Sequence, residues 1–127
     1  MTDFTFTVPG APLSINATYK IVQMRSGAGM TRRLAKTPEA VAWQLGIVYI
    51  VKTARPSGWI PGRRVRINMA FWMNRAGRDA DNPQKALLDS IATALGVNDS
   101  TFLPCVVSNE VDKTNPRVEV TIRNEGE

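Results

Sequence analysis

Residues 64–96 read RVRINMAFWMNRAGRDADNPQKALLDSIATALG, and this stretch decides the fold because it holds a strand followed by a helix. Residues 64–71 alternate between polar and apolar with period two, as in a half-buried strand with its arginines on one face. Residues 82 or 83 to about 95 have apolar side chains at helical spacing, and Gly96 stands where a left-handed residue closes helices. The stripe predicted to face the core is Leu87, Leu88, Ile91, Ala94 and Leu95.

Helix and strand signals continue towards the amino terminus. Residues 4–8 and 19–24 are β-prone, with a turn-rich segment between them. The triplet Thr37-Pro38-Glu39 offers an N-cap, a proline at the first helical position and an acidic first turn, which predicts a helix to about Ala54. Because this helix is apolar nearly all round, we expect much of it to be buried. Residues 25–36, rich in glycine and basic side chains, are expected to form a mobile basic loop.

The chain is predicted to form one domain over residues 1–127, of the α/β (α+β) class. Residues 117–122 alternate as a last strand, and residues 124–127 are expected to be frayed. The predicted order is therefore strand, strand, helix, strand, helix, strand. This order indicates a small mixed β-sheet with two main helices packed on it, in a chain too short for two independent cores.

Composition excludes several classes of protein. The chain has no histidine, which removes Ser-His-Asp and Cys-His catalysis and histidine-bearing zinc sites. Cys105 is the one cysteine, so no internal disulfide forms, and it is expected to be a small buried hydrophobe. The longest apolar run, residues 45–51, is too short to cross a membrane. We expect a soluble, cytoplasmic protein without membrane association.

Charge is distributed unevenly along the chain. Residues 1–78 hold 12 Lys/Arg against 2 Asp/Glu, and residues 79–127 hold 4 against 9, so the two parts carry net charges of +10 and −5. This asymmetry predicts a basic surface for a polyanion beside an acidic pocket for cations.

The acidic residues cluster at Asp79 and Asp81, with Asp89 and Asp99 further on, and Lys85 lies among them. Hard carboxylate oxygens are the ligands that Mg²⁺ and Mn²⁺ prefer. Singly these residues have ordinary explanations, since Asp81 is a good N-cap and Lys85 with Asp89 could be a surface ion pair. Together they favour a metal site, because two carboxylates two residues apart repel unless a cation lies between them.

The sequence resembles Holliday junction resolvases of the RusA type over most of its length. The resemblance is carried by Asp79-x-Asp81-Asn82-x-x-Lys85-Ala86-x-x-Asp89, by Asn98-Asp99-Ser100, by Pro9-Gly10-x-Pro12-x-Ser14-x-Asn16, and by a terminal β segment after Lys113. It implies a homodimer, common in phages and prophages, that binds four-way DNA junctions and nicks them symmetrically with Mg²⁺, for which Mn²⁺ substitutes, in DNA recombination and repair. Asn98 departs from the family, which often has an acidic residue there.

Carried over position by position, the resemblance implies that Asp79, Asp81 and Asp99 bind the metal and act with Lys85 in catalysis. DNA phosphates are expected to be contacted mainly by basic side chains of the first part of the chain. The expected DNA-contacting residues are Asn16, Lys20, Arg32, Arg33, Lys36, Arg78 and Lys113, with further contributions from Arg25, Arg64 and Arg66. Phe71, Trp72 and Phe102 are candidates to wedge into an opened junction, although aromatic residues of this kind more often belong to a core.

Two other functions stay open at this point. One is a nuclease for forks or flaps, and the other is a non-catalytic dimeric DNA-binding protein whose acidic cluster holds a structural cation.

The length of the second helix adds an expectation about the site. A helix over residues 82–95 is about 20 Å long, and residues 96–98 span at most about 10 Å. If all three aspartates serve one ion, Asp99 is therefore expected to come from the partner chain, with these helices antiparallel about a two-fold axis.

Overall fold

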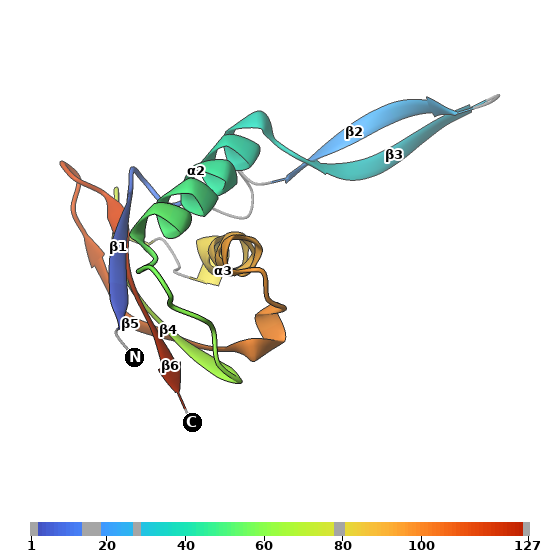
Figure 1. Ribbon diagram of the computed structural model, residues 1–127. Helices are drawn as coiled ribbons and strands as arrows, with labels where there is room; N and C mark the ends of the chain where they lie inside the picture. Colours follow the sequence, from blue (N-terminus) through green and yellow to red (C-terminus); the bar gives the residue numbers. More distant parts are fainter. Residues whose placement is uncertain (1–2, 14–18, 27–28, 78–80, 126–127) are drawn as a thin grey trace.

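The computed structural model describes residues 3–13, 19–26, 29–77 and 81–125; for residues 19–26, 30–34, 81 and 82 it describes the backbone but not the side chains. A four-stranded mixed sheet has the order β1-β6-β4-β5. Its strands are β1 (Phe4–Pro9), β4 (Arg64–Met73), β5 (Phe102–Val111) and β6 (Arg117–Glu125). The sheet carries two helices, α2 (Pro38–Ala54) and α3 (Asp81–Leu95), on one of its faces (Figure 1). The predicted fold class is confirmed.

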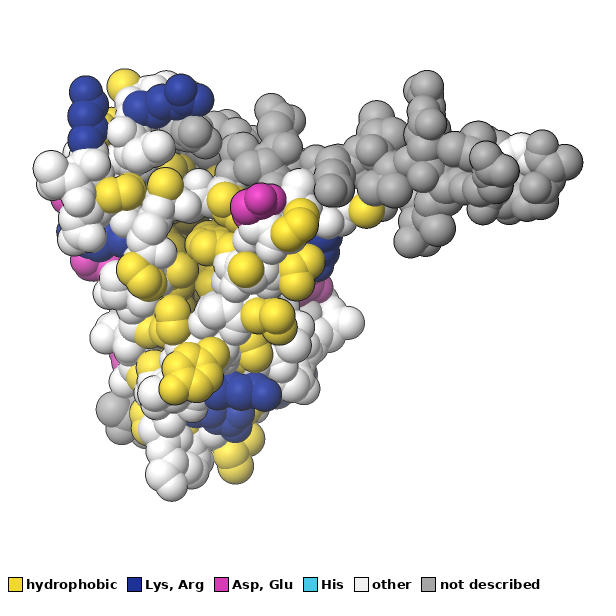
Figure 2. Space-filling model, turned by 90° about the horizontal axis from the view of Figure 1, so that it is seen from above, with side chains coloured by type: hydrophobic (Ala, Val, Ile, Leu, Met, Phe, Trp, Pro, Cys, Tyr) yellow, Lys and Arg dark blue, Asp and Glu magenta, His cyan; other side chains and the backbone are white. Residues whose placement is uncertain are grey.

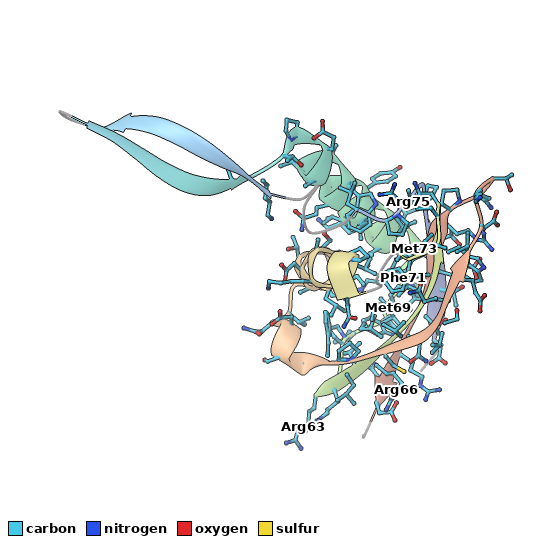
Figure 3. The ribbon with its side chains drawn as sticks, turned by 180° about the vertical axis from the view of Figure 1, so that it is seen from behind. Arg63, Arg66, Met69, Phe71, Met73 and Arg75 are labelled. Carbon is cyan, nitrogen blue, oxygen red and sulfur yellow. The ribbon has the colours of Figure 1, made fainter. Side chains whose placement is uncertain are left out.

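The core lies between the helices and the sheet, because alternate residues of each central strand point to that face. Every second residue of β4 is buried, and Figure 3 labels Met69, Phe71 and Met73 on the side of this strand where the helices pack. Strands β1 and β6 pair in antiparallel register from Phe4↔Ile122 to Pro9↔Arg117 and add their own alternate residues. The period-two pattern of the sequence is thus the pattern of burial.

Helix α2 begins and ends as predicted, but its burial was predicted wrongly. The Ala40 N–H donates to Thr37 Oγ1 over 3.2 Å, so the N-cap is confirmed. Only one stripe of the helix lies on the sheet and α3, and its fully buried residues are Ala40, Ile47 and Val51. A helix on the outside of a sheet has one covered face. Trp43, Val48, Ile50 and Ala54 are only partly buried against the core, and Val41, Leu45 and Tyr49 are exposed.

Helix α3 ends in a sharp turn that returns the chain along the helix. Gly96 has φ +71°, and the N–H groups of Gly96 and Val97 donate back to the carbonyl oxygens of Thr93 and Ala92. This Schellman closure leads into a short 3₁₀ helix, η1 (Asp99–Thr101), and then into β5, which pairs in parallel with β4. The core stripe is as predicted except that Leu88 is only partly buried.

Two strands were not predicted. The segment expected to be a loop contains β3 (Gly29–Lys36), which pairs with β2 (Tyr19–Ser26) in a hairpin that projects from the body (Figure 1). Strand β5 was missed because Pro104 interrupts it and its polar end follows no alternation. It tolerates the proline because it is an edge strand.

The expected fraying at the carboxyl end is corrected for residues 124 and 125, which belong to β6. The Asn124 side chain accepts a hydrogen bond from Gly62 N over 2.6 Å and donates to Ile60 O over 3.0 Å. These two bonds attach the end of β6 to the segment that precedes β4.

Candidate active site

An open cavity with a volume of about 270 Å³ lies beside α3. Its walls are formed by Gln84, Lys85, Leu88 and Asp89 of the helix and by Asp99 of η1. The four helical residues share one face because they are three or four positions apart. Asp99 joins them because the Gly96 turn folds the chain back along the same side. One cavity is therefore bordered by Lys85, Asp89 and Asp99, although Lys85 and Asp99 are 14 positions apart in the sequence.

Lys85 and Asp89 form an ion pair one helical turn apart. Lys85 Nζ lies 3.7 Å from Asp89 Oδ2, and the two side chains are 73% and 38% exposed. An exposed pair of this spacing contributes only tenths of a kcal/mol to stability. Asp89 thus orients the lysine without binding it tightly, and the ammonium group remains accessible to an anion in the cavity.

Asp99 is held in place by its neighbours in η1. Asn98 is the N-cap of this short helix, and its Oδ1 accepts a hydrogen bond from Ser100 N over 2.9 Å. The Thr101 N–H donates to the carbonyl oxygen of Asn98 over 3.0 Å. Asn98, the residue that departs from the family pattern, therefore serves as a cap here. A short amide side chain suits that position well.

The structure describes less of the other predicted acidic residues. Asp79 lies outside the described residues, and Asp81 is the first residue of α3 with its side chain undescribed. Among the described residues no group of three acidic, cysteine or histidine side chains comes close enough to hold a metal ion. The close grouping of the two aspartates at the start of α3 with Asp99 stays a prediction.

The expectation that Asp99 comes from the partner chain was based on the length of the second helix, and the structure removes part of that basis. Asp99 borders the same cavity as Gln84 and Lys85 of its own chain. These residues are only one turn, about 5.4 Å along the axis, from Asp81. Asp99 thus borders the same cavity as the second turn of α3 in its own chain, a placement that the sequence pattern did not indicate.

The predicted DNA contacts fall in three places. Arg78 and Asn16 lie outside the described residues, while Lys20, Arg32 and Arg33 lie on the projecting hairpin, where the backbone alone is described. Lys36 is exposed at the base of the hairpin. Lys113 is exposed in the turn between β5 and β6, where the Asp112 N–H donates to Met73 O. That turn therefore lies at the end of β4 from which the chain continues towards α3.

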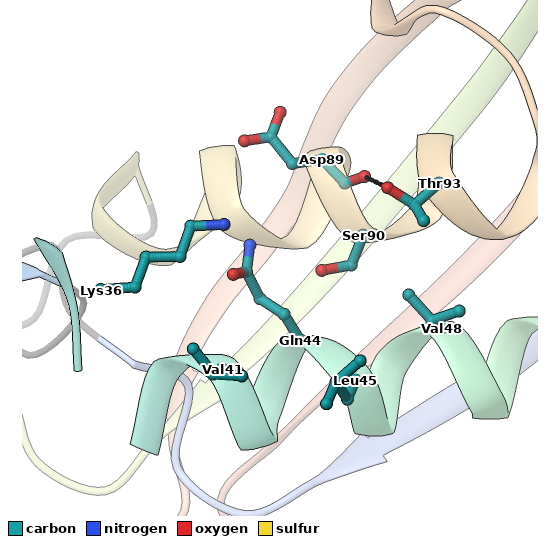
Figure 4. Close-up of a pocket in the computed structure, with 8 residues that line it drawn as sticks. All are labelled: Lys36, Val41, Gln44, Leu45, Val48, Asp89, Ser90 and Thr93. Carbon is teal, nitrogen blue, oxygen red and sulfur yellow. Dashed lines mark hydrogen bonds between the residues drawn. The ribbon is translucent and has the colours of Figure 1, made fainter. Parts of the chain in front are cut away.

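A second cavity adjoins the first across α3. Figure 4 shows Val41, Leu45 and Val48 of α2 facing Asp89, Ser90 and Thr93 of α3, with Gln44 and Lys36 between them. Asp89 borders both cavities, so the ridge formed by this residue separates them. Sequence reasoning missed Gln44, whose side chain donates to Ala86 O over 3.2 Å and links the two helices. A polar residue in an otherwise apolar helix was the available signal.

The aromatic candidates belong to the structure of the sheet. Phe71 and Phe102 are buried, and Trp72 lies under the guanidinium of Arg117 at 4.1 Å from its ring centre. Phe71 and Phe102 therefore belong to the core, and Trp72 is half-buried with Arg117 over its ring. Arg66, one of the expected phosphate contacts, is bound to Glu125 over 2.9 Å, which lowers the pKa of that carboxyl. Cys105 is half-buried on β5 rather than fully buried.

Comparison with known families decides the assignment. The profile of the family described as Endodeoxyribonuclease RusA matches residues 20–123, which is most of the chain. The chain belongs to the RusA endodeoxyribonuclease family. This membership supports a role as a Holliday junction endonuclease, that is, as a nuclease acting on branched DNA. No curated protein matches the sequence. The described helices include none long and apolar enough to span a membrane.

Proposed function

We propose that this RusA-family protein is a Mg²⁺-dependent resolvase that cuts four-way DNA junctions by paired, symmetric nicks in recombination and repair. The observation that supports this most is the cavity shared by Lys85, Asp89 and Asp99 beside the first turns of α3. A carboxylate next to an accessible ammonium group suits phosphodiester hydrolysis. One group binds a hard cation, and the other lies where negative charge develops.

The donor set fits a divalent metal. We propose that Asp99 holds it together with Asp79 and Asp81, since all three offer hard oxygen ligands and the chain has no histidine for a softer ion. When bound, Mg²⁺ or Mn²⁺ would polarise the phosphodiester and lower the pKa of an attacking water.

Lys85 would act on the phosphate itself. Its ammonium group is largely exposed at the cavity, and its ion pair with Asp89 is long at 3.7 Å. A scissile phosphate can therefore replace Asp89 as its partner at little cost. The lysine then offsets charge on the phosphate oxygens or on the leaving oxygen.

We further propose that Asp99 works with Lys85 of its own chain, because both border one cavity of the single chain. This replaces the composite site expected from helix length alone. The homodimer remains part of the proposal for a different reason. Two copies related by a two-fold axis present two equivalent sites, as symmetric nicking of a four-way junction requires.

The test is cleavage of labelled synthetic DNA with Mg²⁺, with Mn²⁺ and with EDTA. The substrates are a four-way junction, a fork, a flap and a linear duplex of the same sequence. We expect the junction to be cut fastest, and only with metal present. A mobility shift without cutting in either metal would establish a non-catalytic binder, while faster cutting of forks or flaps would establish the other nuclease.

A further inference from the structure

The cavity between α2 and α3 has an apolar wall and a polar wall that face each other. The apolar wall is formed by Val41, Leu45 and Val48 of α2, and the polar wall by Asp89, Ser90 and Thr93 of α3 (Figure 4). Figure 2 looks down on α2 and shows hydrophobic side chains gathered on this side of the body. A flat ring with apolar faces and a polar edge is complementary to such a pair of walls.

The polar wall offers mainly hydrogen-bond acceptors. The Ser90 hydroxyl donates to Ala86 O over 2.8 Å, and the Thr93 hydroxyl donates to Asp89 O over 3.0 Å. Because each hydroxyl uses its one hydrogen on the helix backbone, its oxygen can only accept from a ligand. The ionised Asp89 carboxylate is also an acceptor alone. A ligand that brings N–H donors to this wall is therefore favoured over one that brings carbonyl oxygens.

The size of the cavity suits one ring system. Its volume of about 230 Å³ is below the roughly 300–1,000 Å³ of sites for drug-sized ligands. No aromatic side chain is among the described residues that line it. One side is open, since Val41 is 43% and Leu45 65% exposed. A ring can therefore enter sideways from a chain that runs along the surface.

Positive charge lies at one end of the cavity. Lys36, the last residue of β3, lines that end and is exposed (Figure 4). Residues 19–36 hold five Lys/Arg and no Asp/Glu, and the rest of the chain holds eleven of each. The whole net charge of +5 thus belongs to the segment that ends at this cavity. A polyanion is attracted to this end.

The cavity also lies beside the one proposed for catalysis. Asp89 borders both this cavity and the one that contains Lys85 and Asp99. A DNA strand with a phosphate at Lys85 therefore passes within one side chain of the space between the two helices. Its neighbouring bases are the rings that lie nearest to that space.

We propose that the cavity between α2 and α3 binds one unstacked nucleobase of branched DNA and prefers a base with an exocyclic amino group. The ring lies against the apolar wall of α2, its amine donates to the acceptors of α3, and Lys36 contacts a phosphate of the same strand. Cytosine and adenine carry such an amine where thymine carries a carbonyl. The inference rests on the proposed function only for its substrate, branched DNA.

Such a site favours branch points over linear duplexes. Taking a base out of DNA breaks its stacking and pairing, and this costs least where the stack is already interrupted. Strands change direction at the centre of a four-way junction, so the bases there have incomplete stacks. The cavity is therefore filled more readily at a junction than along a duplex.

The first test places 2-aminopurine, an adenine analogue whose fluorescence is quenched by stacking, at each position around the branch point. Binding of the full chain is measured in EDTA, so that no strand is cut. We expect the fluorescence at one position to rise by at least about twofold, because the base leaves its stack for a site without aromatic rings. The same label in a linear duplex should change little.

Leu45→Ser removes part of the apolar wall and should abolish most of this rise. The matched control is Tyr49→Ser, because Tyr49 is 72% exposed on the same helix and lines neither cavity. Circular dichroism checks that both variants are folded. No rise at any position with the wild-type chain, or a rise that Leu45→Ser leaves intact, would overturn the proposal.

The second test compares cytosine with uracil at the position found, since they differ in an amine and a carbonyl on rings of the same size. An abasic site opposite each base removes pairing in both junctions. We expect the cytosine junction to bind about tenfold more tightly. Thr93→Val, which removes one acceptor, should reduce that ratio. Equal affinities of the wild-type chain for both junctions would contradict the acceptor wall.

Two further outcomes distinguish this proposal from others. If Leu45→Ser changes the sedimentation of the protein without DNA and leaves the fluorescence rise intact, the cavity is covered by protein and the base site is refuted. A chain that shows the fluorescence rise but cuts no junction with Mg²⁺ or Mn²⁺ would refute the proposed nuclease alone. A chain that cuts junctions without any rise would refute the base site alone.

Discussion

Of the three proposed metal ligands, Asp99 is the one whose side chain the structure describes. It borders the cavity with Lys85 and is fixed by the cap that Asn98 provides. Asp99→Asn keeps the shape of the side chain but removes its charge. We expect cleavage to fall by on the order of 10²–10³-fold while junction binding and the melting temperature are retained. Asp79→Asn and Asp81→Asn should behave in the same way.

Glu110→Gln is the control for these variants, since Glu110 is an exposed carboxylate on β5 that borders neither cavity. It should cut junctions at the wild-type rate. Loss of folding in Asp81→Asn, seen by circular dichroism, would indicate that Asp81 is a helix cap instead. Retained cleavage by Asp99→Asn would remove that residue from the site.

At the level of residues, the sequence predicted which side chains share a face of the second helix, but it did not predict the position of Asp99 after the turn at Gly96. Helical spacing predicted that Lys85 and Asp89 share a face, and they form an ion pair. The placement of Asp99 depends on the φ angle at Gly96 and on the hydrogen bonds that close the turn there. Periodicity contains no information on the direction of the chain after the helix, so the sequence did not predict that Asp99 borders the same cavity as Lys85.

The turn that closes α3 makes a prediction at the level of elements. Gly96→Ala forces an L-residue into φ +71°, which should cost about 1 kcal/mol of unfolding free energy. Because this turn positions η1, cleavage should fall by more than the change in stability explains. Denaturant unfolding and cleavage rates measure the two effects. Gly46→Ala is the control, since Gly46 has open space around it, an ordinary φ and no place on the hairpin or in either cavity; equal loss of cleavage in both variants would contradict the assignment.

The turn between β5 and β6 should weaken in acid. Asp112 Oδ1 accepts hydrogen bonds from the Thr114 hydroxyl over 3.0 Å and from Asn115 N over 3.1 Å. These bonds, the Thr114 bond first, hold the pKa of Asp112 below its ordinary value of 3.8. A lowered folded-state pKa means that the stabilisation is present above the ordinary value and is lost as pH falls through the lowered pKa.

Thermal unfolding of wild type and Asp112→Ala between neutral pH and strongly acidic pH measures this effect. The difference in melting temperature should be constant near neutral pH and should shrink as the pH drops below 3.8. A difference that stays constant throughout the acidic range would show that the carboxylate charge does not support the turn.

The elements differ in how far the sequence predicted them. Thr37 and Pro38 determined the start of α2, because an N-cap and a proline act locally. The exposure of Leu45 and Tyr49 could not be predicted, since an apolar helix pattern does not say which sides of the helix the rest of the fold covers. Strands β3 and β5 were missed because strand pairing depends on distant partners, which local propensity does not report.

The charge asymmetry of the whole molecule predicts steep salt dependence. The logarithm of junction affinity should fall linearly with the logarithm of salt concentration. Arg32→Ala with Arg33→Ala should flatten the slope by about one unit for each phosphate that the hairpin no longer neutralises. Arg66→Ala is the control, because Glu125 already holds that guanidinium over 2.9 Å. An unchanged slope in the hairpin variant would remove the hairpin from the DNA interface.

Cleavage of a supercoiled plasmid with an extruded cruciform tests the central claim of a metal-dependent, dimeric junction resolvase most directly. Two nicks made within one bound complex convert the plasmid to the linear form, whereas a single nick yields a relaxed circle. With Mg²⁺ we predict mainly linear product with paired cuts across the junction, and with EDTA we predict none. Intact plasmid in both Mg²⁺ and Mn²⁺ would contradict nuclease activity, and relaxed circles alone would contradict paired cutting by a two-fold dimer.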